Sequence, residues 1–349
     1  MSKSSEDIRL RLLKEILKPS ISESILGVES MDDAALVRIS DEESLVIASD
    51  FIRGSGFYLF TLGYLSYYDV GYYLVSANLS DIAAMGARPT GLTTVIRYTK
   101  SMSDDQYLEI FKGMQEACTR YCVSIVGGDT GGYAEDVFCA TAFGIMKSKN
   151  ALLRKNVKEG DSLCVTGGYL GLPISAIIYF KELKPLGKFI LSEEEEKILL
   201  QSWKEPNVRI EEGVLIAEKS LANACQDISD GLKATIEQMS EISDKYFDLD
   251  ESSIPIHPVT KKIAEFLGLD PVHIAVSASV DFELMFTVSK DNLSKLNTEF
   301  SEKELSFHVI GRANGDSQNW LIKNNEKTEL PGIAWKHQMN DFIKDLIAN

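Results

Sequence analysis

Cysteine and histidine are scarce in this chain of 349 residues, and their spacing excludes several kinds of site. Cys118 and Cys122 are one helical turn apart, but no C-x-x-C pair, second thiol pair or nearby histidine completes a zinc site. Buried, reduced thiols are therefore the favoured interpretation of the five cysteines. The four histidines form neither an H-E-x-x-H motif nor the spacing of a catalytic triad.

Basic residues are also few, because 36 lysines and arginines face 52 acidic residues and the net charge is −16. This balance argues against a nucleic-acid partner, whereas a nucleotide held through metal ions remains compatible with it. No apolar run reaches membrane-spanning length, and the first 17 residues (MSKSSEDIRLRLLKEIL) predict an amphipathic helix rather than a signal peptide. The sequence thus predicts a cytoplasmic protein with neither a nucleic-acid nor a membrane partner.

The length predicts two domains, since it exceeds what one ordinary core accommodates. Patterns typical of strands and helices alternate along the chain, which predicts an α/β fold with mixed sheets. The charged, turn-like stretch RKNVKEGD at 154–161 places the boundary, giving domains 1–150 and 151–349. Within this frame we expect a strand at 124–126 that ends in a glycine-rich turn at 127–132, and a further strand at 272–277.

The segment SANLSDIAAMGARP, residues 76–89, predicts the last turns of a helix that begins near Asp69. Gly86 and Pro89 are the expected stop signals. Asp81 lies inside this apolar, small-residue helix and shares a face with Asn78. A carboxylate there is costly unless it is paired or bound to a cation. Two interpretations remain open, a hydrogen-bonded core aspartate and a metal ligand.

Aspartates recur next to serine, threonine or glycine where strands end and helices begin, at positions 32, 33, 50, 81, 129, 227 and 230. Hard divalent cations take oxygen ligands, and converging carboxylates repel one another unless metals lie between them. This pattern predicts a polyphosphate site with two or three metal ions. The alternative is that the same aspartates are helix caps and turn formers.

Two glycine-rich stretches fit neither common nucleotide-binding motif. GGDTGG (127–132) lacks the lysine of a P-loop, and VTGGYLG (165–171) is not a G-x-G-x-x-G fingerprint. Backbone N–H groups in such stretches reach phosphates in some proteins and form plain tight turns in others. Arg154 is either a phosphate contact or a solvated side chain. Phe57, Tyr58 and Phe282 either stack on a substrate ring or belong to the core.

Taken together, these segments resemble the thiamine-monophosphate kinase family of the aminoimidazole ribonucleotide synthetase superfamily. The matching pieces follow the family's order from about residue 5 to the end: MDDAAL, ASD, NLSDIAAMGARP, IVGGDT, ALLRKNVKEGD, VTGGYLG, DISDGL, DFELMFTV and IGR. NLSDIAAMGA and DISDGL are the specific ones. The resemblance implies two α/β domains of the synthetase type. It also implies a homodimer that associates through its N-terminal sheets, with ATP at the interface.

The resemblance also implies the residues of the site, together with Mg²⁺ and ATP. Its magnesium ligands are Asp33, Ser49, Asp50, Asp81, Asp129, Asp227 and Asp230. Its ATP contacts are Gly128, Asp129, Arg154 and Ser229. Asp50, Asp129 and Asp230 are the implied catalytic residues. At residue 48 the family's serine or threonine ligand is Ala48, which offers only a backbone carbonyl.

The implied reaction moves the γ-phosphoryl group of ATP onto thiamine monophosphate, giving thiamine diphosphate. The departures from the family pattern lie on the substrate side, where Phe57, Val280 and Trp335 are the candidate contacts. The loop FIRGSGF, with Arg53 and Gly56, is one residue shorter than usual, and Val280 replaces a glutamate. Met31 takes the place of a glycine before the paired aspartates. Two alternatives stay open, an ATP-dependent kinase for another small phosphorylated metabolite and a non-catalytic ATP-binding protein.

Overall fold

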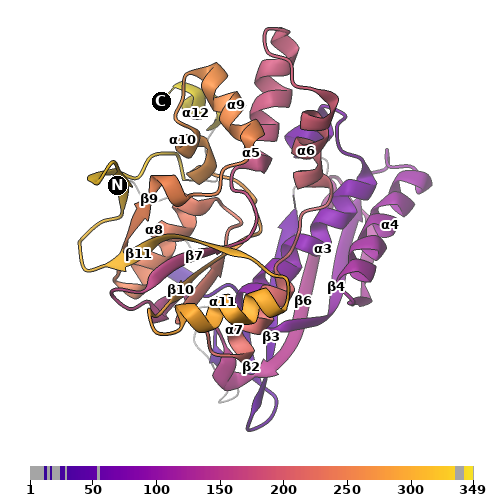
Figure 1. Ribbon diagram of the computed structural model, residues 1–349. Coiled ribbons are helices and arrows are strands. Elements are labelled where there is room, and N and C mark those ends of the chain that lie inside the picture. The colour runs from indigo at the N-terminus through magenta and orange to yellow at the C-terminus, as the bar shows by residue number, and fades with distance from the viewer. Residues whose placement is uncertain are drawn as a thin grey trace.

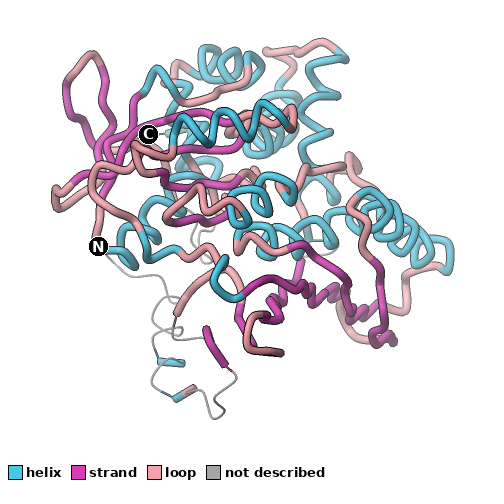
Figure 2. The backbone as a smooth tube through the Cα atoms, turned by 60° about the horizontal axis from the view of Figure 1, so that its bottom comes forward, coloured by secondary structure: helices cyan, strands magenta, loops and turns pink. Residues whose placement is uncertain are grey.

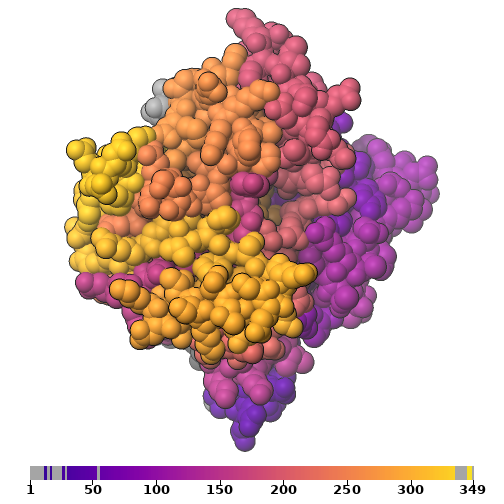
Figure 3. All heavy atoms as spheres, in the orientation of Figure 1, coloured from indigo at the N-terminus to yellow at the C-terminus, as the bar shows by residue number. Residues whose placement is uncertain are grey.

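The computed structural model describes residues 12–13, 16–17, 24–27, 30–52, 56–334 and 342–348. These residues form two sheets with helices packed between and around them (Figures 1 and 2). The N-terminal and C-terminal parts of the chain occupy opposite sides of the space-filling view and meet along one seam (Figure 3). The predicted α/β architecture with mixed sheets is confirmed.

The first sheet has six strands, in the order β1-β2-β3-β6-β4-β5. Their bounds are β1 Ser24–Leu26, β2 Ala35–Arg38, β3 Glu43–Ile52, β4 Arg88–Tyr98, β5 Ser124–Gly132 and β6 Val137–Lys147. Among the strand pairs described in this sheet, β4 and β5 are parallel and the others are antiparallel. Along β4 and β6 buried and more exposed residues alternate, so one face packs on helices and the other is open.

Helix α3 (Tyr67–Ala84) lies at the centre of the molecule, where the two sheets meet (Figure 1). It begins with a capping box, in which the Ser66 side chain accepts from the Asp69 backbone and the Asp69 carboxylate accepts from the Ser66 backbone. It ends before Gly86, whose φ is +78°. The helix is buried on almost all sides, which its all-round apolar sequence predicts. It contacts β3 and β6 of the first sheet and β8 of the second.

The second sheet has seven strands, in the order β13-β12-β9-β11-β7-β10-β8. Their bounds are β7 Ser162–Thr166, β8 Ala224–Asp227, β9 Tyr246–Asp250, β10 Leu284–Val288, β11 Phe307–Asn314, β12 Trp320–Lys323 and β13 Glu326–Glu329. The remaining α-helices are α2 Tyr58–Thr61, α4 Asp104–Arg120, α5 Leu172–Ile177, α6 Glu193–Lys204, α7 Ile210–Glu218, α8 Leu232–Ser243, α9 Pro258–Leu267, α10 Pro271–Val276, α11 Leu293–Glu302 and α12 Phe342–Ala348. Short 3-10 or π segments cover η2 Ser148–Asn150, η3 Arg154–Asn156, η4 Ile178–Leu183, η5 Lys184–Leu186 and η6 Glu251–Ser253.

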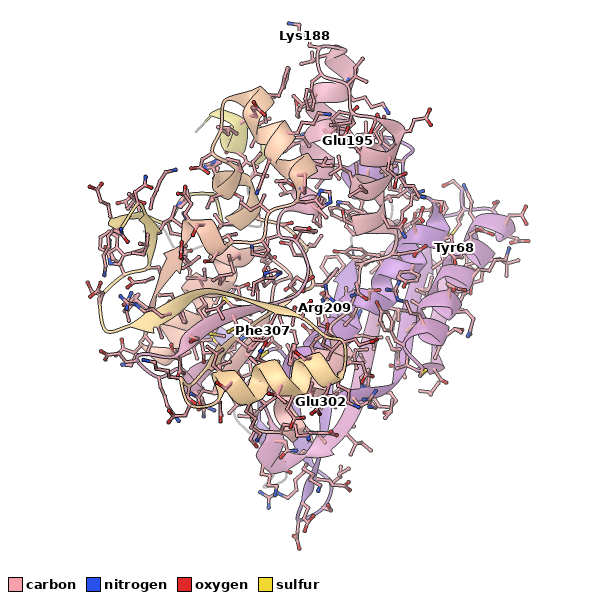
Figure 4. All side chains as sticks on the ribbon, in the orientation of Figure 1. Tyr68, Lys188, Glu195, Arg209, Glu302 and Phe307 are labelled. Carbon is pink, nitrogen blue, oxygen red and sulfur yellow. The ribbon has the colours of Figure 1, made fainter. Side chains whose placement is uncertain are left out.

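Arg209 lies near the middle of the molecule (Figure 4), and its ion pair with Glu283 ties α7 to the second sheet. Arg209 donates to both carboxylate oxygens of Glu283, at 2.7 and 2.5 Å, and also to Glu212 at 3.2 Å. The backbone of Glu283 accepts from Ile228 N at 2.8 Å. The bidentate pair therefore anchors the turn that follows Asp227, which belongs to the site described below.

Two expectations about local structure are wrong. Residues 127–132 are not a turn, because the glycine-rich stretch continues strand β5 at the edge of the first sheet. Residues 272–277 are not a strand, because Pro271–Val276 form helix α10, with Asp270 as its cap and Pro271 in its first turn. The helix expected near the N-terminus falls mostly outside the described residues. Within the described ranges, no helix combines the length and apolarity that a bilayer span requires.

Candidate functional site

Three aspartates from distant parts of the sequence meet beside α3. Asp33 precedes β2, Asp81 lies on α3, and Asp227 ends β8. One carboxylate oxygen of each lies within 4.8 Å of one oxygen of each of the other two. The side chains of Asp33 and Asp227 are buried. The structure thus brings together three of the predicted metal ligands. Asp81 on α3 lies with Asp33 of the N-terminal part of the chain and Asp227 of the C-terminal part.

Burial and mutual repulsion act strongly on this acidic cluster. The pKa of Asp81 is raised well above its usual value, first by burial and then by the charges of Asp227, Asp33 and Asp50. Burial and Asp33 also raise the pKa of Asp227, while a hydrogen bond from Ser80 lowers it. Carboxylates held this close in a poorly solvated place favour a bound cation.

Arg154, in η3, places its guanidinium group beside the acidic cluster. It forms a short ion pair with Asp33 and donates to the carbonyl oxygen of Met31 at 3.0 Å. Its backbone N–H donates to Asp32 Oδ1 at 2.8 Å. Asp32 Oδ2 is buried and has no hydrogen-bond partner in the part of the chain that the structure describes, and burial raises the pKa of this carboxyl group. In their ionised form the Asp32 carboxylate and the three converging carboxylates are acceptors only, which suits a hard divalent cation.

Strand β3 points Ser49 and Asp50 to opposite faces of the first sheet. Asp50 lies on the inner row with buried Ala140 and Thr94, facing α3, and its backbone N–H donates to Asn78 Oδ1 at 3.0 Å. Its charge acts on Asp81. Ser49 lies on the outer face, where its hydroxyl is 2.6 Å from the hydroxyl of Thr141. Asp50 therefore belongs to the surroundings of the cluster, and Ser49 does not.

Asp129 is also on the outer face of the first sheet. The register places it in one row with Phe51, Cys139 and Val95, three strands from β3. At about 4.8 Å per strand this puts it roughly 14 Å from Phe51. Its carboxylate pairs with Arg97, whose hydrogen bond lowers the pKa of Asp129. Gly128 precedes it on this exposed edge strand, so neither residue joins the cluster within one chain.

The turn after β8 contributes the remaining predicted residues. The Ser229 hydroxyl donates to Asp227 Oδ1 at 3.1 Å, which places it next to the cluster. Asp230 follows in the same bend and is exposed. Both residues therefore lie at the edge of the second sheet where Asp227 ends its strand.

The candidate substrate contacts do not gather at one place: some pack in the core, one is exposed and two lie outside the described residues. Phe57 packs edge-on against Tyr73 and Trp203, with ring centroids 5.1 and 5.5 Å apart. Phe282 joins the same aromatic cluster through Tyr73 at 5.5 Å. Val280 is half-buried against the core. Gly56 is exposed, and Trp335 and Arg53 lie outside the described residues.

Two polar residues of α3 were missing from the predicted site. The Ser80 hydroxyl donates to Asp227 Oδ2 at 2.6 Å and is completely buried. Asn78, also buried, accepts from Asp50 and donates to the carbonyl oxygen of Leu74 at 2.9 Å. Both are polar side chains in an otherwise apolar helix that carries Asp81, and this was the available signal.

Family models match both halves of the chain. The model of the N-terminal domain of AIR synthase related proteins matches residues 31–146, and that of the C-terminal domain matches residues 158–322. The thiamine-monophosphate kinase of Pyrococcus abyssi is 31% identical over 88% of this chain and 89% of its own length. The enzyme of that name from Buchnera aphidicola (Schizaphis graminum) is 33% identical, with 89% and 91% covered.

A solved structure shares the whole fold. The structure described as AaThiL complexed with AMPPCP and TMP superposes with a TM-score of 0.77 over 96% of this chain and 97% of its own, at 23% identity. The two sheets and the helices between them are therefore a known arrangement.

Proposed function

This chain belongs to the thiamine-monophosphate kinases of the AIR synthase related family, and on that premise we propose that it transfers the γ-phosphoryl group of ATP to thiamine monophosphate. It is an enzyme with ATP as its co-substrate. The observation that carries the proposal is the meeting of Asp33, Asp81 and Asp227 within 4.8 Å beside one guanidinium. Phosphoryl transfer depends mainly on charge neutralisation and positioning, and such a cluster supplies both once cations are bound.

We propose Mg²⁺ as the cation. Asp33, Asp81 and Asp227 would hold it, with Asp50 facing the same place from β3. Bound Mg²⁺ neutralises phosphate charge and orients the transferred group. Ser80 and Ser229 orient the Asp227 carboxylate through their hydroxyls. Arg154 is held by Met31 and Asp33 beside the cluster, where its guanidinium suits a phosphate group. Asp230 remains a proposed ligand on the adjoining turn.

The acceptor needs little help from a base, because the attacking atom of a phosphate monoester is already an anionic oxygen. This agrees with a cluster that contains carboxylates and one arginine and no histidine among the groups placed there. The chain's own contribution is therefore to position the two phosphate groups and to keep Asp81 and Asp227 in the protein interior.

The proposed activity is tested by incubating the protein with ATP, Mg²⁺ and thiamine monophosphate and separating the products by chromatography. We expect thiamine diphosphate to form, and Asp81→Asn to lower turnover at least 100-fold. The melting temperature of Asp81→Asn should not fall, because a neutral amide of similar size replaces a carboxylate that the neighbouring aspartates repel. Other phosphorylated heterocycles serve as comparison acceptors. ATP consumption without thiamine diphosphate would reject this acceptor, and normal turnover by Asp81→Asn would reject the cluster.

We propose that the chain divides into domains at residues 1–150 and 151–349. The strands of the first sheet end with β6 at Lys147, those of the second begin with β7 at Ser162, and the family models leave a gap between 146 and 158. We also propose a cytoplasmic location, where ATP is available and the five cysteines, which are all free, would stay reduced.

A second copy of this chain is the proposed partner, through the outer face of the first sheet. Phe51, Val95 and Ile145 are 59%, 41% and 44% exposed on that face, and Val126 is 60% exposed on the edge strand. Open apolar sheet faces of this kind are typical of interfaces between subunits. The face also carries Ser49 and Asp129, so association would cover the predicted residues that lie outside the cluster of one chain.

Light scattering after size-exclusion chromatography tests the dimer. We expect about twice the chain mass of 38.7 kDa for the natural protein. Val95→Asp should shift the mass to that of one chain, because it buries a charge in the proposed contact. Ile190→Asp, at a residue that is 76% exposed elsewhere, is the matched control and should leave the mass unchanged. A single-chain mass for the natural protein would contradict the dimer without touching the phosphoryl-transfer proposal.

A further inference from the structure

A cavity of about 550 Å³ lies away from the acidic cluster, between the link from β6 to β7 and the link from α7 to β8. Sites for small molecules commonly have volumes of about 300–1,000 Å³. Asn223 lines it just before β8, whereas Asp227 ends the same strand. Four residues of extended chain, at about 3.3 Å each, put roughly 13 Å between these two Cα atoms. The cavity is thus a separate place in the fold.

The charged side chains that line this cavity are all cationic. Lys149 and Lys158 lie on the β6–β7 link, and the other polar side chains are the amides of Asn150, Asn156 and Asn223 and the hydroxyl of Ser220. Among the described residues the lining contains no carboxylate, although the chain carries a net charge of −16. Two ammonium groups with several neutral donors make a local positive potential that attracts an anion.

One acidic residue lies behind the lining and fixes its geometry. Asp161 is buried, and its two carboxylate oxygens accept from the amide nitrogen of Asn223 at 3.0 and 2.9 Å. This turns Asn223 Oδ1 toward Lys158, whose ammonium group is 3.4 Å away. The Lys158 ammonium carries three N–H donors, so it retains capacity for an anion in the cavity.

A neighbouring cavity between the two halves of the chain has a different lining, in which cationic and acidic side chains occur together. It has a volume of about 260 Å³ and shares Asn150 with the larger one. Its lining combines Arg88 and Lys147 with Glu218, and Arg88 also forms an ion pair with Glu211 at 2.7 Å. Cations there are matched by carboxylates, whereas the lining of the larger cavity has cations alone.

We propose that the larger cavity binds a phosphorylated small molecule, with its phosphate oxygens on the ammonium groups of Lys149 and Lys158. Lysine binds phosphate as a point charge, and two lysines match a group with a charge near −2. The amides of Asn150 and Asn156 and the hydroxyl of Ser220 supply hydrogen bonds to the rest of the molecule. The site does not depend on the proposed phosphoryl transfer, because it shares no residue with the acidic cluster.

Calorimetric titration with inorganic pyrophosphate in metal-free buffer tests the proposal. Without divalent cations the acidic cluster repels the probe, so binding reports on other sites. We expect one molecule bound per chain, and an affinity at least 10-fold weaker for the double variant Lys149→Ala/Lys158→Ala. The double variant Lys100→Ala/Lys303→Ala removes the same charge elsewhere and should bind within 2-fold of the natural protein.

Three outcomes would overturn the assignment. The natural protein shows no binding, the cavity variant binds as well as the natural protein, or both double variants weaken binding equally. The last result would mean that net charge alone attracts the probe. Circular dichroism of both variants establishes that each is folded, and since both pairs of lysines are exposed, neither substitution disturbs the core.

Discussion

At the scale of single residues, Met31 occupies a backbone conformation that suits glycine. Its φ is +55°, and its carbonyl oxygen accepts from Arg154 Nη1. The left-handed region costs an ordinary L-residue about 1–2 kcal/mol, so this conformation is held by its surroundings. A positive φ at this position agrees with the glycine of the family pattern, because glycine adopts that region without the cost that Met31 carries.

Met31→Gly should therefore stabilise the protein by up to about 1 kcal/mol, after the greater freedom of glycine in the unfolded chain is subtracted. Urea unfolding measures the change. Val37→Gly, in β2, is the contrasting substitution and should destabilise, because glycine weakens a strand interior. A lower unfolding free energy for Met31→Gly would show that the methionine side chain contributes more than its backbone costs.

Ser80→Ala tests whether the hydroxyl on Asp227 serves the site. Removing this 2.6 Å hydrogen bond leaves a buried carboxylate oxygen without its donor. Partners of metal ligands commonly affect metal affinity or activity about 10- to 100-fold, and we expect kcat/KM to fall within that range. The Mg²⁺ concentration for half-maximal activity should rise.

Ser76→Ala is the matched control for this experiment. Ser76 is equally buried on the same helix, but its hydroxyl donates to the Tyr72 carbonyl of α3 itself, at 3.2 Å. Its turnover and Mg²⁺ dependence should match those of the natural protein. If the two variants behaved alike, Ser80 would have only a structural role.

At the scale of elements, the glycine-rich residues 127–132 form part of strand β5 because they pack closely against β4. A Cβ atom at Gly128 would lie 2.2 Å from the Thr94 backbone oxygen of β4, whereas one at Gly127 would meet nothing within 4 Å. Gly128→Ala should therefore cost about 1–3 kcal/mol of stability, through the forced displacement of β4. Thermal unfolding measures it, and Gly127→Ala is the control. Equal melting temperatures of the two variants would contradict the close packing.

Helix α12 is docked on α10 through one imidazole. His273 Nδ1 accepts from Gly332 N, and its Nε2 lies 3.2 Å from the Leu346 carbonyl oxygen. Burial lowers the pKa of His273, Lys233 lowers it further, and the Leu346 carbonyl and Asp270 oppose the shift. Protonation would put a hydrogen on Nδ1 and break the bond to Gly332.

Because the pKa of His273 is lower in the folded protein than its ordinary 6.5, the unfolded chain takes up this proton first as the pH falls. The unfolding free energy should therefore decrease from pH 6.5 down to the folded pKa, and be fully restored above pH 6.5. Urea unfolding at pH 5.5 and 7.5 measures the difference, which should be smaller in His273→Gln. An identical pH dependence in the variant would exclude this role.

The sequence predicted α3 and its end at Gly86 because apolar, small-residue content and the stop signals Gly86 and Pro89 agree there. It failed at Pro271–Val276 because the alternating β-branched residues Val272, Ile274 and Val276 fit a strand equally well, and only the Asp270 cap and Pro271 favoured a helix. It failed at β5 because glycine signals a turn locally, whereas pairing with β4 decides the outcome. The cluster of Asp33, Asp81 and Asp227 was predictable as a set of residue types, but the opposite faces of Ser49 and Asp50 depend on register.

At the scale of the whole molecule, α3 connects the two parts of the chain. It packs on β3, β6 and α4 of the first part, and on α6, α7 and β8 of the second. Gly71 of α3 lies so close to α4 that a Cβ atom would be 2.0 Å from the Ile110 oxygen. A helix buried from both sides gains most of its stability from neighbours that are distant in sequence.

This placement of α3 has a consequence for how the chain folds. The first half does not carry a finished interior by itself, because a fragment of residues 1–150 would leave in water the apolar surface of α3 that packs on α6, α7 and β8. We expect that fragment to aggregate or stay partly unfolded, and the intact chain to lose both sheets in one cooperative step. In hydrogen exchange, the amides of α3 should be among the last to become labelled, opening only with global unfolding.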